Sequence, residues 1–122
     1  MKQLTKIEIE NWKLYKIPGQ TDMQRVKIDV IHLSIANSFE HEMKKCELAY
    51  KFMKEGDKII TEAVEISSDL RRDLINISTG ETYEIENSKM ARSNRHPSNI
   101  NVVYYDKSSI QQRTTFEKDK SE

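Results

Sequence analysis

Residues 71–86 read R-R-D-L-I-N-I-S-T-G-E-T-Y-E-I-E, and this stretch predicts a β-hairpin. A β-branched run leads into a Ser-Thr-Gly turn and then a second alternating run, and Gly80 suits a turn position that needs a positive φ. A two-residue turn register puts Asp73 directly opposite Glu84. Glu86 joins them, because residues i and i+2 of a strand share a face. We therefore expect three carboxylates on one face of this hairpin.

Such a group of acids has two interpretations. Three carboxylates on one face repel each other unless a cation lies between them, and hard divalent cations, Mg²⁺ above all, prefer oxygen ligands. The motif then indicates metal-assisted phosphate chemistry. The alternative is a solvated strand face, because 33% of the chain is charged and acids often lie near one another by chance.

Composition limits the classes of protein that remain. The 122 residues fit one domain with a modest core, and no apolar run approaches the ~18 residues of a membrane span. The first residues lack the apolar stretch of a secretory signal. Cys46 is the only cysteine, which excludes a disulfide framework and a thiolate zinc cluster. We therefore expect a cytoplasmic protein without a membrane segment.

Any nucleic-acid partner must be held by local basic patches, because 20 Lys and Arg balance 20 Asp and Glu. Residues 87–99 contain no acid, and two arginines immediately precede Asp73. Both groups flank the carboxylate hairpin, where a phosphate backbone would need neutralising. A solvated loop with a chance charge bias is equally open. The candidate nucleic-acid-binding residues are Arg71, Arg72, Lys89, Arg92 and Arg95.

The remaining elements follow from periodicity. Residues 4–17 and 25–35 read as two strands of a paired or edge ribbon. A helix opens at 37–38 and ends at Gly56, followed by strands over 57–66 and 100–106 and by a frayed polar tail. The stripe of this helix that we expect to be buried consists of Phe39, Met43, Cys46, Ala49, Phe52 and Met53, widened by Leu48 and Tyr50.

From residue 38 onward the expected order is helix, three strands, loop, strand. With the Asp-led strand, the Y-E-I-E strand and the later I-N-V-V-Y-Y-D strand, this order resembles the core of the PD-(D/E)xK nuclease superfamily, which includes archaeal Holliday-junction resolvases and type II restriction enzymes. The resemblance covers residues 37–106. It implies an α/β (α+β) fold, a restriction-endonuclease-like mixed sheet with a flanking N-terminal core helix. The domain organisation is then a β extension over 1–36 (the ribbon), the nuclease-like core over 37–106 and a flexible tail over 107–122.

The resemblance also implies a role for each acid. Asp73 matches the metal-binding aspartate of the motif, and Glu84 matches the second metal-binding acid. Glu86 takes the third position, which is most often lysine, and arginine stands where the motif has proline before the aspartate. On the helix the family's acid corresponds best to Glu40, with Glu47 as the fallback. Mg²⁺ or Mn²⁺ would then be held by Asp73, Glu84 and Glu40, with Glu86 completing the catalytic set.

The implied activity is hydrolysis of DNA phosphodiester bonds by a small endonuclease, acting on duplex or branched DNA as a homodimer. One alternative is a catalytically inactive member of the fold that binds nucleic acid or a protein. Another is an unrelated α+β interaction module whose acids are only surface residues. The three histidines lack zinc-ligand spacing, although His41 could border the metal site. A glycine-rich phosphate loop is absent from the sequence, which argues against nucleotide-dependent enzymes.

Overall fold

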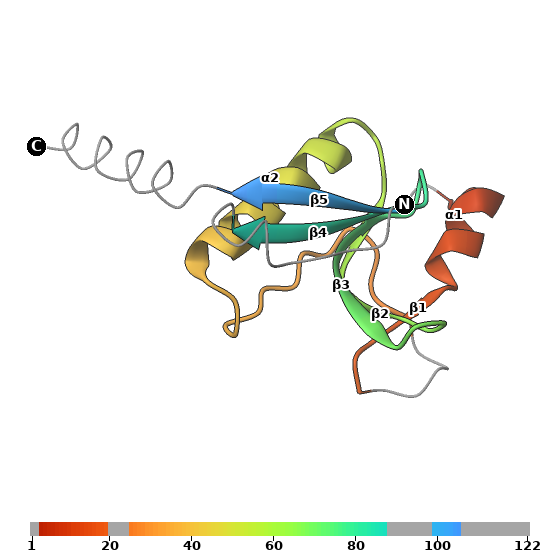
Figure 1. Ribbon diagram of the computed structural model, residues 1–122. Coiled ribbons are helices and arrows are strands. Elements are labelled where there is room, and N and C mark those ends of the chain that lie inside the picture. The colour runs from red at the N-terminus through yellow and green to blue at the C-terminus, as the bar shows by residue number, and fades with distance from the viewer. Residues whose placement is uncertain (1–2, 20–24, 88–98, 106–122) are drawn as a thin grey trace, which may run out of the picture.

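The computed structural model describes residues 3–19, 25–87 and 99–105, which form a mixed α+β domain of two helices and a five-stranded sheet (Figure 1). The expected α+β class is confirmed. In chain order the elements are α1 (Lys6–Trp12), β1 (Tyr15–Lys16), α2 (Phe39–Lys54), β2 (Ile59–Glu65), β3 (Leu70–Asn76), β4 (Glu81–Asn87) and β5 (Ile100–Tyr105). In the described part of the chain, no helix is long and apolar enough to cross a membrane.

The strands follow the order β1-β2-β3-β4-β5 across the sheet. The first three pairings are antiparallel, whereas β4 and β5 run parallel, so the sheet is mixed. Helix α2 packs on one side and contacts β2, β3, β4 and β5, while α1 lies at the far end of the sheet (Figure 1). The helix and the four strands expected after residue 37 are therefore confirmed, to within a few residues at their ends.

The expected β-ribbon before the helix is wrong. Residues 6–12 are helical, and the described residues between 25 and 38 form neither helix nor strand. The helix begins with a capping box, in which the Thr5 hydroxyl accepts the Glu8 N–H at 3.1 Å and the Glu8 carboxylate accepts the Thr5 N–H at 2.9 Å. This T-x-x-E signal satisfies two otherwise unpaired amides and outweighs the alternating pattern. The two-residue β1 joins the main sheet through β2.

Residues 28–34 follow β2 through side-chain contacts instead of a strand ladder. Asp29 (φ 60°) accepts the Ile59 N–H on its carboxylate at 2.9 Å and donates its own N–H to the Ile59 carbonyl at 2.7 Å. The Thr61 hydroxyl donates to the Val30 carbonyl and accepts the His32 N–H. Because side chains bridge the two segments, the β-branched run forms no regular strand.

The buried face of α2 differs from the predicted stripe. Ala49 and Phe52 are buried as expected, and they pack with Ile59 and Leu74 of the sheet. The other buried positions of the helix are charged. The predicted core positions that are instead exposed are Phe39, Met43, Tyr50 and Met53. The stripe prediction fails there because a buried ion-pair cluster, described below, occupies the inner face of the helix.

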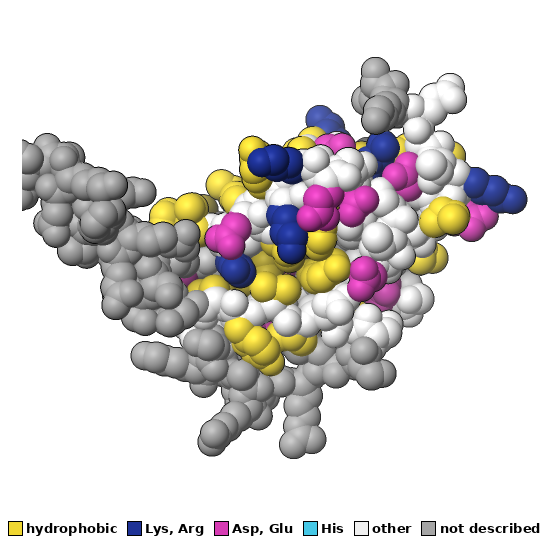
Figure 2. All heavy atoms as spheres, turned by 90° about the horizontal axis from the view of Figure 1, so that it is seen from above, with side chains coloured by type: hydrophobic (Ala, Val, Ile, Leu, Met, Phe, Trp, Pro, Cys, Tyr) yellow, Lys and Arg dark blue, Asp and Glu magenta, His cyan; other side chains and the backbone are white. Residues whose placement is uncertain are grey.

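A second core lies on the other side of the sheet, among residues from β1, β2, β3 and the segment after β1. Its buried members are Tyr15, Val26, Ile60, Ala63, Ile75 and Ile77. On the surface, acidic and basic side chains are interspersed with hydrophobic ones on the face seen in Figure 2. That face carries no single-sign charged area, in keeping with the balanced composition.

The β3–β4 connection keeps the predicted register but is a four-residue loop over 77–80, because the last paired residues are Asn76 and Glu81. Gly80 has φ 82°, and the Asn76 side-chain oxygen accepts the N–H groups of Ser78 and Thr79. A Cβ added at Gly80 would lie 3.2 Å from Nδ2 of Asn11, an amide that donates to the Ile77 carbonyl. Glycine at position 80 therefore serves two purposes: it adopts the positive φ of the turn, and it leaves room for Asn11 of helix α1.

We expect Gly80→Ala to lower the free energy of unfolding by about 1–2 kcal/mol, the cost of a left-handed backbone for a residue with a Cβ, and by more if Asn11 cannot yield. Gly56→Ala is the matched control, because Gly56 has φ 93° and open space around its Cβ position. Urea denaturation measures both variants. Equal losses would contradict a role for the Asn11 contact.

Candidate active site

Asp73 lies where β3 and β4 stop pairing through their backbones. The paired residues end at Leu74 and Tyr83, although both strands continue beyond them. The next step of this register places Asp73 opposite Glu84, so the hairpin register predicted from the sequence is confirmed. The Asp73 carboxylate accepts the Ile85 N–H at 2.7 Å, which ties it to β4 in place of a ladder bond.

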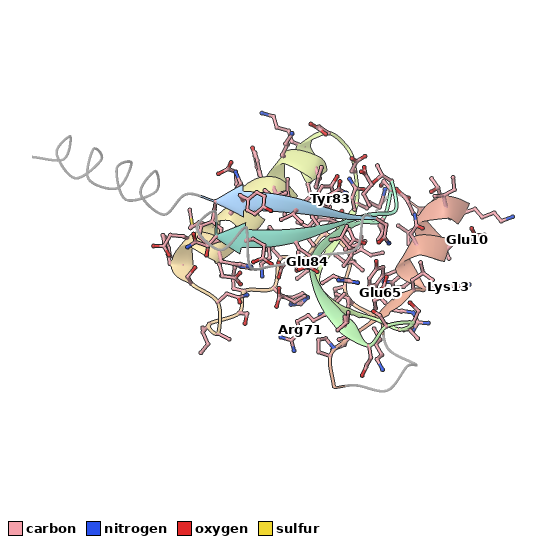
Figure 3. The ribbon with its side chains drawn as sticks, in the orientation of Figure 1. Glu10, Lys13, Glu65, Arg71, Tyr83 and Glu84 are labelled. Carbon is pink, nitrogen blue, oxygen red and sulfur yellow. The ribbon has the colours of Figure 1, made fainter. Side chains whose placement is uncertain are left out.

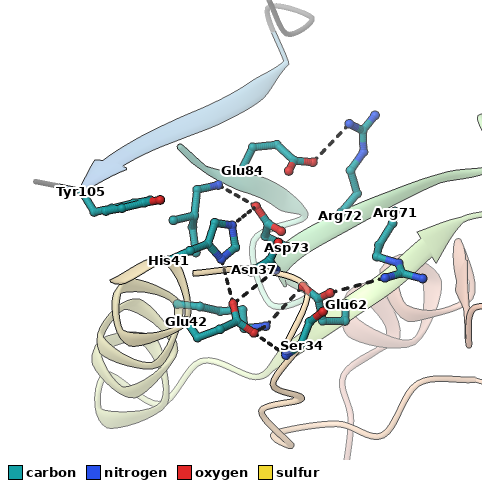
Figure 4. Close-up of polar contacts among 12 residues, drawn as sticks. Ser34, Asn37, His41, Glu42, Glu62, Arg71, Arg72, Asp73, Glu84 and Tyr105 are labelled. Atoms are coloured by element: carbon teal, nitrogen blue, oxygen red, sulfur yellow. Dashed lines mark hydrogen bonds and ion pairs between the residues drawn. The ribbon is translucent and has the colours of Figure 1, made fainter. Parts of the chain in front are cut away.

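Helix α2 contributes a histidine that bridges two carboxylates (Figure 4). His41 Nε2 lies 3.3 Å from Asp73 Oδ2, and Nδ1 lies 2.7 Å from Glu42 Oε2. Burial alone would lower the pKa of His41, but the hydrogen bonds and charges of Asp73 and Glu42 outweigh it and raise the pKa to about 9. At neutral pH His41 is therefore an imidazolium that donates from both nitrogens.

The two opposed carboxyl groups of Asp73 and Glu84 have divergent acidities. Burial, the charge of Asp73 and a hydrogen bond with Asp73 raise the pKa of Glu84 to about 8. Burial would also raise the pKa of Asp73, but hydrogen bonds from His41 and the Ile85 N–H and the His41 charge lower it. At neutral pH and without a bound cation, the pair therefore holds one proton on Glu84 and one negative charge on Asp73.

Arg72 fixes Glu84 from the opposite side. Its side chain is 8% exposed, and its guanidinium lies 3.3 Å from Glu84 and 3.2 Å from Glu65. The Nε atom of this guanidinium has no hydrogen-bond partner in the described part of the chain. The expected phosphate contact does not fit Arg72, because its buried guanidinium is already paired with Glu84 and Glu65.

A second cation, Lys45, lies beneath the His41 pair. Its side chain has no exposed surface, and its ammonium donates to the His32 carbonyl at 2.6 Å, to Glu42 at 2.7 Å and to Glu62 at 3.2 Å. These three acceptors use all three ammonium donors. The Ser34 N–H also donates to Glu42, at 2.5 Å. Burial would raise the pKa of Glu42, but Lys45, Ser34 and His41 lower it.

Glu62 reaches this cluster through an unusual backbone conformation. It lies inside β2 with φ 51°, and the β2–β3 register places it opposite Asp73. The left-handed residue interrupts the alternation of β2, so Thr61 contacts the 28–34 segment while Glu62 contacts Lys45 on the same side. Burial, followed by the charges of Asp73 and Glu42, raises the pKa of Glu62 against the lowering effect of Lys45. Such strain in a strand is typical of functional sites.

The divalent ion that the resemblance implies prefers hard oxygen ligands, which Asp73 and Glu84 present. Because the charge of Asp73 raises the pKa of Glu84, a cation at this pair would relieve their repulsion. Among the described residues, no group of three or more His, Cys, Asp or Glu side chains is arranged around one point. Mg²⁺ is commonly held by one or two carboxylates, with water and phosphate as the other ligands. The residues therefore fit an ion held by two side chains.

The other predicted acids lie around this pair. The structure brings His41, the residue after Glu40, into contact with Asp73. Glu40 is half-buried and forms no hydrogen bond with another described residue, so its role as a ligand stays a prediction. Glu47 is exposed and pairs with Lys44. Glu86 is half-buried on β4 opposite Tyr104 of β5, and its role also stays a prediction.

Of the predicted basic residues, Arg71 is the one that the structure leaves accessible. Its side chain is 55% exposed and lies 3.8 Å from Glu62, and Figure 3 shows it far from Glu10 on α1. Lys89, Arg92 and Arg95 lie outside the described residues.

A groove of about 570 Å³ opens beside Arg71 and Glu62. Its apolar lining comes from Ile17, Pro18, Val26, Val30, Leu33 and Ile35.

Sequence reasoning missed the charged residues that surround Asp73, namely Glu42, Lys45 and Glu62. The signal for two of them was present, because Glu42 and Lys45 are spaced i, i+3 along the helix on the face that also carries Ala49 and Phe52. For Glu62 the sequence offered no such signal, since a left-handed glutamate inside a strand has no sequence signature.

Comparison with known proteins finds no significant match to a family model, to a curated protein or to a solved structure.

Proposed function

We propose that this protein is a small divalent-metal-dependent endonuclease of the restriction-endonuclease-like fold, acting on DNA in the cytoplasm. The observation that carries the proposal is the Asp73–Glu84 pair, two acids at facing positions where β3 and β4 stop pairing, with Asp73 held by His41. The fold gives further support. The order α2-β2-β3-β4-β5, in a mixed sheet with a helix on one side, agrees with the order that the resemblance implies for the nuclease core.

In this proposal each residue has a separate task. Asp73 and Glu84 would hold Mg²⁺ or Mn²⁺, which when bound supplies the positive charge that favours attack of water on a phosphodiester. His41 and the Ile85 N–H fix the orientation of Asp73, and Arg72 fixes Glu84. Glu86, two residues along the same strand, would orient the attacking water and accept its proton. Exposed Arg71 would bind a backbone phosphate of duplex or branched DNA.

A second candidate is a nuclease-fold module that binds nucleic acid or protein without catalysis. The observation that favours it is the internal pairing of both acids, Asp73 with His41 and Glu84 with Arg72. The chain's own cations can hold these carboxylates without a metal. The absence of lysine at position 86 points the same way, because glutamate cannot stabilise negative charge developing on a phosphate.

Cleavage of labelled linear, branched and single-stranded DNA in Mg²⁺, Mn²⁺ or EDTA separates the two. We expect metal-dependent cleavage that Asp73→Asn and Glu84→Gln each reduce at least ~100-fold, since loss of a ligand exceeds the 10–100-fold effect of losing an outer contact. Glu10→Gln is the control, because Glu10 is an exposed acid on α1, remote from Glu84 (Figure 3). Metal binding by calorimetry without cleavage of any substrate would favour the binding module. If the protein neither binds the metal nor cleaves any of these substrates, the endonuclease proposal is overturned.

A further inference from the structure

Helix α2 carries a line of large apolar side chains on its outside. The exposed fractions are 65% for Phe39, 46% for Met43, 66% for Tyr50 and 37% for Met53. At about 100° per residue these four positions fall within roughly 80° of the helix circumference, and Cys46 falls on the same line. They form one continuous stripe along the helix, which we call the outer stripe.

The outer stripe is separate from the face that packs on the sheet. That face contains Glu42, Lys45, Ala49 and Phe52, which are buried. The exposed parts of the four stripe side chains amount to roughly 400 Å² of apolar surface, close to the size at which a patch on a monomer marks an interaction site. The charged residues of the helix lie along one edge of this stripe, so the patch has a defined polar border.

The charges on that border alternate in sign along the helix. From the N-terminal end they are Glu40, Lys44, Glu47, Lys51 and Lys54. In two parallel copies related by a two-fold axis, the two charged borders would lie on opposite sides of the helix pair and would not meet. In two antiparallel copies, Glu40 would face the partner's Lys51 and the partner's Lys54, so the pattern is complementary to itself under a two-fold rotation.

We propose that the outer stripe binds a second copy of this chain, giving a two-fold dimer in which the α2 helices pack antiparallel. In this arrangement Phe39 contacts the partner's Met53, and Met43 contacts the partner's Tyr50. Cys46, midway between these pairs, lies beside the two-fold axis. An apolar contribution of roughly 400 Å² is about half of the ~800 Å² that each partner buries in a standard interface, the apolar share usual for such contacts.

The first test is sedimentation equilibrium of the full chain across a range of concentrations. We expect a reversible dimer at tens of micromolar that Tyr50→Glu weakens at least about tenfold, because a central aromatic is replaced by a desolvated charge. Ile7→Glu is the matched control, since Ile7 is 62% exposed on α1 and lies outside the stripe. Circular dichroism confirms that both variants are folded. A wild-type chain that stays monomeric, or a Tyr50→Glu variant that associates normally, would overturn the proposal.

The second test addresses the orientation. We expect Glu40→Lys to weaken the dimer and the double variant Glu40→Lys/Lys54→Glu to restore it. A short bis-maleimide should cross-link the wild type through Cys46 and leave Cys46→Ser unlinked. In the Cys46→Ser background, Lys54→Cys should resist cross-linking, because the two sites lie roughly 24 Å apart in an antiparallel pair. Efficient cross-linking there would mean parallel helices and would overturn the antiparallel arrangement.

Discussion

We expect Lys45→Met to lower the free energy of unfolding by about 3–5 kcal/mol, the loss typical when one partner of a buried ion pair is removed. The ammonium of Lys45 is fully buried and donates to Glu42, Glu62 and the His32 carbonyl. Without it two buried carboxylates face each other beside Asp73, and a carbonyl loses its donor. Methionine keeps the apolar stem and the helix propensity, so the change isolates the charge.

Lys44→Met is the matched control, because Lys44 is the neighbouring lysine and pairs with exposed Glu47. Its loss should cost less than about 0.5 kcal/mol. Urea denaturation measures both variants, and Lys45→Met/Glu62→Gln should recover part of the loss. If Lys45→Met is too unstable to purify, Glu62→Gln alone should still destabilise by more than the control. Equal stability of the Lys45 and Lys44 variants would contradict the role given to the cluster.

The second large effect is a loss of stability with rising pH in EDTA. The folded pKa of His41 is about 9 against 6.5 ordinarily, and that of Glu84 is about 8 against 4.5. At a pH between the ordinary and the folded pKa of either group, the folded protein holds a proton that the unfolded chain has released. The free energy of unfolding therefore falls as pH rises through that interval. The His41 contribution is complete below pH 6.5 and is lost by about pH 9, a change of up to about 3 kcal/mol.

The raised pKa of Glu84 also lowers the free energy of unfolding as pH rises, over a lower pH range, from 4.5 to about 8. Urea unfolding at a series of pH values measures both contributions. His41→Asn should flatten the upper part of the curve and Glu84→Gln the lower part, whereas Glu10→Gln should leave the curve parallel to the wild type. Curves that stay parallel for all three variants would show that these protons are not held in the folded state.

The two effects concern one network of paired charges around Asp73, formed by residues of α2, β2, β3 and β4. Burying charges in this way stabilises a fold less than apolar packing would, so a structural role alone explains it poorly. The cluster instead holds Asp73 and Glu84 in fixed positions with divergent pKa values, an arrangement common at catalytic sites. This is why we place the proposed chemistry at this pair.

The sequence by itself determined the local elements whose signals depend on near neighbours. The β3–β4 hairpin follows from its β-branched runs and from a turn in which Gly80 has the required positive φ. The register that sets Asp73 opposite Glu84 follows from the centre of that turn at Ser78-Thr79, although the loop is two residues longer than predicted. The start of α2 at Ser38, whose hydroxyl accepts the His41 N–H, was readable for the same reason. Capping and turn chemistry act over a few residues, so a single sequence carries them.

The tertiary structure decided which residues meet Asp73. His41 reaches it because α2 packs across the sheet, and Glu42 holds the other nitrogen of His41. Glu62 joins the cluster because its left-handed backbone turns the side chain toward Lys45. Helix α1 is a different case, because its capping box at Thr5 is a local signal that was present in the sequence although alternation predicted a strand. Burial of charge depends on partners distant in the sequence. Apolar periodicity therefore could not predict that the inner face of α2 holds an ion-pair cluster while its apolar stripe faces outward.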